Sequence, residues 1–338
     1  MKRIAAFLVV LLVVVAGSAA WWLYTGVDRP FKGYGATEQF VEIPQGAGSV
    51  AIAKRLADAG VVRDVHSFRV ALWITGEGRR LQAGEYRFDR PLSARQVADK
   101  IARGDVYVRP ITFPEGLTIK QMAALYESKG FGPAQDFATA AKNAALVSAL
   151  DPDAKNLEGY LFPDTYALPR KATADQLVQR MVTAFMKALT PDLLEKAESR
   201  GLTIRQFVTL ASIVEKETGT KEERPLVAAV YANRLRIGMP LQCDPTVIYA
   251  LDRAGRYDGN LTRQNLQFDS PYNTYRYPGL PPGPIASPGL ASLDAAAAPP
   301  DVPYLYFVSK NDGTHAFAAT LDEHNRNVQQ YQVRYFKK

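Results

Sequence analysis

The most apolar part of the chain is its N-terminal stretch. An uncharged run from Ile4 to Tyr24 follows Lys2 and Arg3, and about 20 apolar residues are enough to cross a bilayer as a helix. Aromatic residues, among them Trp21, close this run, as is typical of the membrane interface. The pattern therefore predicts a single transmembrane helix over residues 4–24.

The charges beside this helix predict its orientation. Because Lys and Arg favour the cytoplasmic side, we expect residues 1–3 to form a cytoplasmic tip and the rest of the chain to lie outside. A signal peptide cleaved near Ala20 is the alternative, and it leads to the same exported domains. Residues 25–38, which are rich in Gly and Pro, are expected to be a short linker.

A strand–turn–helix pattern then occurs three times. Each copy pairs a short strand with a helix whose first turn a Ser or Thr can cap. The pattern predicts a small α+β domain over residues 39–110, followed by a larger α+β domain over residues 111–338. The expected copies are strand 40–43 with a helix from Ser49 to 56, strand 86–88 with a helix from Ser93 to 101, and strand 108–113 with a helix from Thr118 to 126.

A later apolar pattern predicts a buried helix over residues 202–218 that ends in two glutamates, Glu215 and Glu217. Its apolar positions cover most of the circumference. Burial and the C-terminal helix dipole both disfavour an ionised carboxylate, so both effects raise a glutamate pKa. A raised pKa suits a general acid near neutral pH. The alternative is that both glutamates pair with arginines such as Arg224 or Arg234 and serve structure only.

Polar, Gly/Pro-rich loops follow this helix and are long for simple connections. Together with an earlier stretch around Glu158, they predict a cleft with hydrogen-bonding groups and tyrosines. Glu215 and Arg234 are expected to support the site.

Composition removes several classes of function. The formal net charge is +7 and the charged fraction 22%, and no run of Lys and Arg indicates nucleic-acid binding. Cys243 is the single cysteine, so neither an internal disulfide nor a cysteine-based metal cluster can form. Cys243 is either a small, partly buried residue that fills space in the core or a nucleophile. Three scattered histidines form no metal-binding spacing, and we expect no cofactor; His315 and His324 are structural residues or, alternatively, ligands or bases.

The chain resembles the endolytic murein transglycosylase family, the YceG-like proteins. The order and spacing of several motifs carry this resemblance, with Cys243 standing where Thr or Ser is expected. Residues 39–110 also resemble, loosely, the LysM-like domain that precedes the catalytic domain in this family, either as a glycan-binding module or as a spacer. The matching motifs are Glu158-Gly-Tyr-Leu-Phe-Pro-Asp-Thr-Tyr166, Ala211-Ser-Ile-Val-Glu-Lys-Glu-Thr218, Asn233-Arg-Leu-Arg-Ile-Gly-Met239, Leu241-Gln-Cys-Asp-Pro-Thr-Val-Ile-Tyr249, Tyr272-Asn-Thr-Tyr275 and Gly279-Leu-Pro-Pro-Gly283.

The resemblance implies a bacterial inner-membrane lytic transglycosylase. It would cut the β-1,4 bond between N-acetylmuramic acid and N-acetylglucosamine within glycan strands, leave 1,6-anhydro ends and limit nascent strand length. The family places the catalytic acid at Glu217, whereas helical geometry alone does not separate Glu217 from Glu215. Because they lie in the matching motifs, six residues are expected to line the cleft: Glu158, Asn233, Gln242, Asp244, Tyr272 and Asn273. The expected partners are glycan strands and peptidoglycan synthases.

Two other functions fit parts of the sequence. A non-catalytic, membrane-anchored glycan-binding scaffold would need the N-terminal helix and the small domain but no acid. A small-molecule lyase that uses pyridoxal phosphate is a label attached to some family members, but its cytosolic chemistry conflicts with the exported topology.

Overall fold

The computed structural model describes residues 2–334 and divides them into two compact units. The small unit comprises residues up to Arg109 together with Pro169–Lys171, and the large unit comprises Pro110–Leu168 and the chain from Ala172 onward. Met1 and residues 335–338, which belong to the expected tip and catalytic domain, lie outside the described residues. Both units combine helices with short two-stranded sheets, so the expected α+β class is confirmed.

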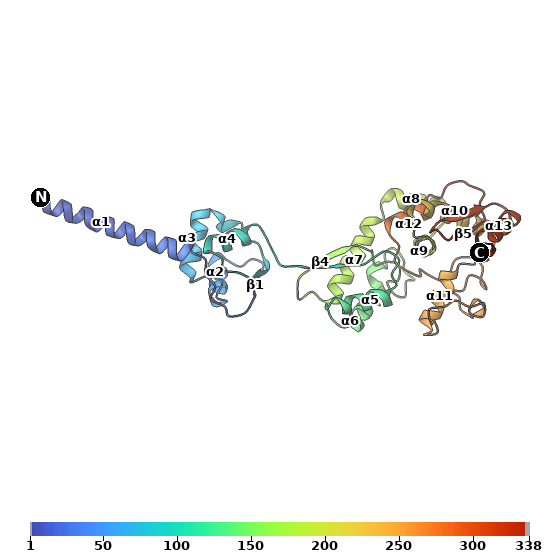
Figure 1. Ribbon diagram of the computed structural model, residues 1–338, viewed down its shortest axis with the longest axis horizontal. Helices are drawn as coiled ribbons and strands as arrows, with labels where there is room; N and C mark the ends of the chain where they lie inside the picture. The colour runs from blue at the N-terminus through green and yellow to red at the C-terminus, as the bar shows by residue number, and fades with distance from the viewer. Residues whose placement is uncertain (1, 335–338) are drawn as a thin grey trace. The chain divides into compact units, whose positions relative to one another are not determined.

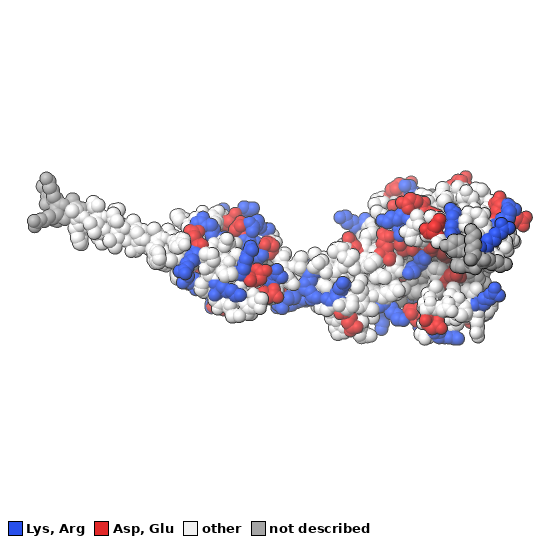
Figure 2. Space-filling model, in the orientation of Figure 1, with Lys and Arg blue, Asp and Glu red and all other residues white. Residues whose placement is uncertain are grey.

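The N-terminal helix α1 spans Lys2–Leu23 and continues into a π-helical turn, η1, at Tyr24–Asp28. The segment Ala6–Asp28 is long and apolar enough to cross a membrane. Its apolar side chains are exposed (Phe7 by 66%), and Figure 2 shows the described part of α1 without charged side chains on the face in view. By length and composition, an anchor and a signal segment both fit this helix.

The small unit is built around an antiparallel pair of strands. Strand β1 pairs with β2 from Gln39↔Phe88 to Ile43↔Gly84, and alternate side chains such as Val41 and Tyr86 enter a core that the helices cover. Its elements after η1 are β1 (Gln39–Ile43), α2 (Ser49–Asp58), α3 (Val65–Thr75), η2 (Glu77–Arg79), β2 (Gly84–Phe88) and α4 (Ala94–Ala102) (Figure 1).

Two details of this unit differ from the sequence-based expectation. Ser49 does not cap α2, because Gly48 takes the N-cap position and Ser49 is already helical. In addition, part of the segment expected to be a linker, residues 25–38, packs on the small unit. Val27 is fully buried in its core, and Phe31 exchanges backbone hydrogen bonds with Leu92.

The third strand–helix copy lies almost entirely in the large unit. Strand β3 pairs with β4 rather than with β1 or β2, and α5, which Thr118 caps as expected, packs against α6. The large unit contains β3 (Arg109–Thr112, which begins at the last residue of the small unit), α5 (Ile119–Ser128), α6 (Ala134–Ala140), η3 (Ala144–Val147), β4 (Thr165–Leu168), α7 (Ala174–Ala188), α8 (Pro191–Ser199), α9 (Ile204–Glu217), η4 (Lys221–Glu223), α10 (Arg224–Arg236), α11 (Asp244–Arg253), η5 (Asn265–Gln267), α12 (Leu290–Ala297), β5 (Tyr306–Ser309), β6 (His315–Ala318), α13 (Leu321–Val328) and η6 (Gln329–Val333).

Helix α9 lies at the centre of the large unit. A capping box between Thr203 and Gln206 begins it, and its middle residues, from Phe207 to Val214, are all buried. Helices α8, α10, α11 and α12 all contact α9. This packing fixes the position of the two glutamates in its last turn.

Candidate active site

The two glutamates at the end of α9 have different surroundings. Glu215, whose side chain is 4% exposed, forms an ion pair of 2.8 Å with Arg224 of α10. Its second oxygen accepts hydrogen bonds from the backbone N–H of Gly289 (3.0 Å) and the hydroxyl of Ser292 (2.8 Å). A buried carboxylate with a cation and two further donors is satisfied in its ionised form. Glu215 therefore ties α9 to α10 and to the start of α12.

Glu217 has no such cation. Its Oε1 accepts a hydrogen bond of 2.6 Å from the hydroxyl of Tyr231 on α10, and the buried thiol of Cys243 also bonds to it. Within residues 2–334, no Lys, Arg or His forms an ion pair with this carboxyl group. The residue as a whole is partly exposed. The geometry thus separates the two glutamates, which the helical pattern alone did not.

Burial raises the pKa of Glu217 above its ordinary value. The negative charge of Asp244 acts in the same direction, whereas the hydrogen bonds from Cys243 and Tyr231 and the charge of His315 oppose it. Burial is the largest of these effects, so the pKa is raised overall. A carboxyl group in this setting keeps its proton at a higher pH than an exposed one and can act as a general acid.

Aromatic rings pack against Tyr231. The ring of Tyr231 contacts the ring of Phe307 in β5 edge-on, with centroids 5.9 Å apart, and the ring of Phe307 contacts the ring of His315 edge-on as well. His315 is held by Glu223, with Nδ1 and Oε2 2.7 Å apart. These contacts fix the Tyr231 ring and with it the direction of the hydroxyl that holds Glu217.

The loop before α11 places two exposed polar residues beside the buried Cys243. Gln242 has φ +50°, a strained value for a residue with a side chain, and its backbone N–H bonds to the carbonyl of Thr274. Asp244 begins α11 and accepts a hydrogen bond of 2.6 Å from Tyr275. The side chains of Gln242 and Asp244 are exposed on either side of Cys243. Strain of this kind is often found at functional sites.

Two of the expected cleft residues, Asn273 and Asn233, use their side-chain amides within the protein. Asn273 is fully buried, and its amide donates to the carbonyls of Leu266 and Phe268. The amide of Asn233 likewise donates to the carbonyls of Val302 and Tyr304. Both amides are occupied in holding loops together, so neither donor is free for a substrate.

Arg234 and Tyr272 have well-defined surroundings. Arg234 is buried and donates to the carbonyls of Leu305 (2.7 Å) and Leu241 (2.6 Å), which fixes the strand β5 region and the loop before Gln242. The ring of Tyr272 lies against Tyr249, with centroids 5.0 Å apart. Tyr272 lies with Glu158 rather than with Glu217.

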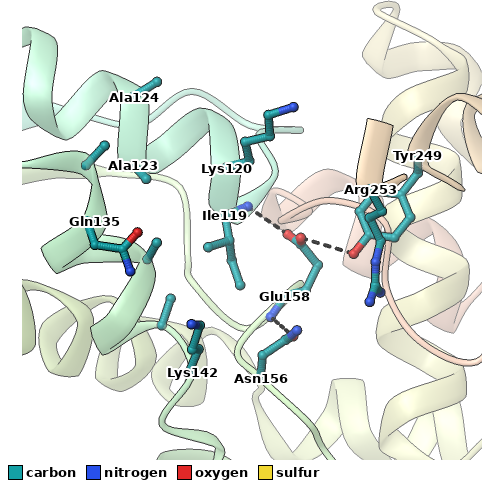
Figure 3. A pocket seen from close by; sticks show the side chains of 13 residues that line it. Ile119, Lys120, Ala123, Ala124, Gln135, Lys142, Asn156, Glu158, Tyr249 and Arg253 are labelled. Carbon is teal, nitrogen blue, oxygen red and sulfur yellow. Dashed lines mark hydrogen bonds between the residues drawn. The ribbon is translucent and has the colours of Figure 1, made fainter. Parts of the chain in front are cut away.

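Glu158 forms a second buried acidic centre at the other end of α11. Its oxygens accept hydrogen bonds from the backbone N–H of Ile119 (3.0 Å) and the hydroxyl of Tyr249 (3.2 Å). Burial raises its pKa to about 7, although these two bonds and the charge of Arg253 act in the opposite direction. Glu158 lines a cavity of about 490 Å³ (Figure 3).

Sequence reasoning missed Tyr231 and Arg253. The guanidinium of Arg253 lies over the rings of Tyr249 and Tyr272, 5.7 and 5.2 Å from their centroids. Tyr231 lies three residues before Arg234, on the same side of α10. This spacing from Arg234 is a signal in the sequence that Tyr231 can contact the same region as the arginine.

The fold and the site define an α+β protein with one protonatable carboxyl group at the end of a buried helix. The sequence profile of the YceG-like family matches residues 41–330. The chain therefore belongs to the YceG-like family.

Individual relatives agree with this assignment. An endolytic murein transglycosylase of Bacillus subtilis is 31% identical, over 86% of this chain and 84% of that protein. One of Streptococcus pneumoniae is 30% identical over 97% of this chain and covers 65% of that longer protein. A crystal structure of a yceG-like protein from Listeria monocytogenes has a TM-score of 0.59 and 31% identity, over 86% of this chain and 98% of that one.

Proposed function

We propose that this protein is an endolytic murein transglycosylase whose general acid is Glu217. The observation that carries the proposal is the buried carboxyl group of Glu217, which is held by the Tyr231 hydroxyl at 2.6 Å and forms no ion pair with any Lys, Arg or His of residues 2–334. The relatives named above are transglycosylases, so an enzyme is favoured over a glycan-binding scaffold.

The proposed reaction needs a single carboxyl group. Protonated Glu217 gives its proton to the oxygen of the β-1,4 bond between N-acetylmuramic acid and N-acetylglucosamine, and this bond breaks. The resulting carboxylate then takes the proton from the C6 hydroxyl of the muramic acid, whose oxygen closes on C1. The product is a 1,6-anhydro end, and no water adds, so the second carboxylate of ordinary glycosidases is not required.

The surroundings of Glu217 suit both proton transfers. Burial favours the protonated form before cleavage. The hydroxyl of Tyr231 stabilises the carboxylate that forms when the proton leaves, because a hydrogen bond to a charged acceptor is stronger than one to a neutral acceptor. Gln242 and Asp244 are proposed to contact the sugar beside the cleaved bond. Glu215 and Arg234 support the site by holding the elements around it.

We further propose that α1 anchors the protein in the inner membrane with both units on the outer side. The apolar segment Ala6–Asp28 supports this, and Lys2 and Arg3 favour a cytoplasmic N-terminus. In this place the enzyme would act on strands near the membrane and limit their length. Peptidoglycan synthases are then the expected protein partners.

The direct test is digestion of purified sacculi by the wild type and by Glu217→Gln, with the fragment ends identified by mass. The wild type should release fragments with 1,6-anhydro ends, and Glu217→Gln should release none while keeping the wild-type circular dichroism spectrum. Glu222→Gln is the matched control, because Glu222 is an exposed glutamate nearby and its loss should change nothing. Full activity of Glu217→Gln would reject the proposed acid.

A further inference from the structure

A groove runs between α5 and α11 in the large unit. A cavity of about 270 Å³ is lined by Lys216, Pro245 and Ile248 among others, and the cavity of about 490 Å³ beside Glu158 continues from it. Lys120 and Tyr249 line both cavities, so the two are neighbouring parts of one depression. We call it the α5–α11 groove.

Two short connections along the chain link one end of the groove to the proposed acid. Lys216, at one end, directly precedes Glu217, and Cys243, which bonds to Glu217, is the N-cap of α11. Helix α11 then leads from Asp244 to Arg253 at the other end, roughly 14 Å at 1.5 Å per residue. A ligand that extends from Lys216 along α11 therefore reaches the larger cavity.

The rim of the larger cavity is cationic. Lys142 and Lys120 are exposed on one side, and Arg253 lies on the other over the rings of Tyr249 and Tyr272. Figure 3 shows Lys120, Lys142 and Arg253 arranged around Glu158. Two carboxyl groups are nearby, but both are occupied. Asp252 pairs with Lys120 at 2.6 Å, and Glu158 is buried and already holds Ile119 and Tyr249.

The shape of the cavity favours a peptide over a sugar. Sugar rings stack on open aromatic faces, but Tyr249 is only 7% exposed and Arg253 and Tyr272 cover its ring. The wall formed by α5 and α6 consists largely of alanines, including Ala123 and Ala138, which leaves space for small side chains. An extended peptide of about four residues spans roughly 13 Å, close to the length of α11.

We propose that the α5–α11 groove binds the acidic peptide that muramic acid carries in murein, so that the enzyme prefers peptide-bearing strands over peptide-free ones. In this arrangement Lys142 and Arg253 bind the carboxylates of the peptide while the glycan lies at Glu217. The inference rests on the proposed function, because only a murein strand presents a peptide beside the cleaved bond.

The test compares two substrates with the full-length protein in detergent at low salt. One is uncrosslinked murein strands, and the other is the same strands after an amidase has removed their peptides. Wild type should cut the peptide-bearing strands at least about threefold faster. Lys142→Glu should lower this ratio of rates about two- to fivefold, the size expected for an exposed ion pair. Arg253→Gln should also lower this ratio of rates, because Arg253 lies on the opposite side of the cavity.

Lys187→Glu is the matched control, because Lys187 is an exposed lysine of α7 outside the groove. It should leave the ratio unchanged. Equal rates on both substrates for wild type, or a Lys142→Glu variant that slows both substrates equally, would overturn the peptide site while leaving the proposed function intact. Cleavage of neither substrate by wild type would overturn the proposed function and this inference with it.

Discussion

The substitution Tyr231→Phe isolates the hydroxyl that holds Glu217. It removes one oxygen that donates at 2.6 Å and leaves the ring that packs edge-on against Phe307. A hydrogen bond of this kind contributes about 0.5–1.5 kcal/mol net, and about 1.4 kcal/mol corresponds to a tenfold change in rate. We therefore expect cleavage to slow by about two- to tenfold while the fold is kept.

The same substitution has a pH signature that a purely structural role would not produce. The Tyr231 bond lowers the pKa of Glu217, so its removal raises that pKa further. Because cleavage starts from the protonated acid, activity is lost as the pH rises through this pKa. The alkaline limb of the rate profile should consequently move to higher pH in Tyr231→Phe.

The assay measures the rate of formation of 1,6-anhydro ends on uncrosslinked strands between about pH 5 and pH 9. Tyr277→Phe is the matched control, since the exposed Tyr277 donates a similar bond of 2.7 Å to Asp269 far from α9 in the sequence. It should change neither the rate nor the profile. A Tyr231→Phe enzyme with the wild-type rate, or with an alkaline limb at lower pH, would refute the reasoning.

Two further predictions concern stability. Arg224→Ala leaves Glu215 buried without its cation and should lower the free energy of unfolding by about 3–5 kcal/mol. The double variant Arg224→Ala with Glu215→Gln should recover part of this loss. Urea unfolding measures both variants, and the same loss of unfolding free energy in the single and the double variant would contradict the ion-pair account. Glu158 has a pKa raised from 4.5 to about 7, so its stabilising effect is complete below about pH 4.5 and is lost as the pH rises through 7. Relative to wild type, Glu158→Gln should therefore be more stable at pH 8 than at pH 5, by roughly 3 kcal/mol. The same difference at both pH values would show that Glu158 keeps an ordinary pKa.

Local patterns predicted the elements well. Apolar periodicity predicted α1 and α9, and the side-chain caps of α4 and α5 are the expected Ser93 and Thr118. These features depend on residues within a few positions of one another. The sequence alone was therefore sufficient for them.

Contacts between elements that are far apart in the sequence could not be predicted from these local patterns. The third strand–helix copy looks like the first two, but its strand pairs with β4 in the other unit. Val27 lies in a Gly-rich stretch that reads as a linker, yet it enters the core of the small unit. Such contacts depend on which surfaces meet, and periodicity carries no information about that.

The candidate site likewise combines features that local sequence predicts with features that depend on long-range packing. The sequence placed Glu215 and Glu217 on a buried helix, but only the packing of α10 gives Arg224 to one and Tyr231 to the other. Asn273 belongs to a polar loop and was expected in the cleft, but the loop folds back on its amide. The role of a polar loop residue depends on backbone groups that the sequence does not position.

The central claim is that a single acid, Glu217, cleaves the strand without adding water. Digestion of uncrosslinked strands in heavy-oxygen water, followed by mass analysis of the new ends, tests it most directly. The account predicts anhydro ends that are one water lighter than hydrolysed ends and carry no heavy oxygen, and none of these ends with Glu217→Gln. New ends that contain heavy oxygen would show that water attacks and would contradict the account.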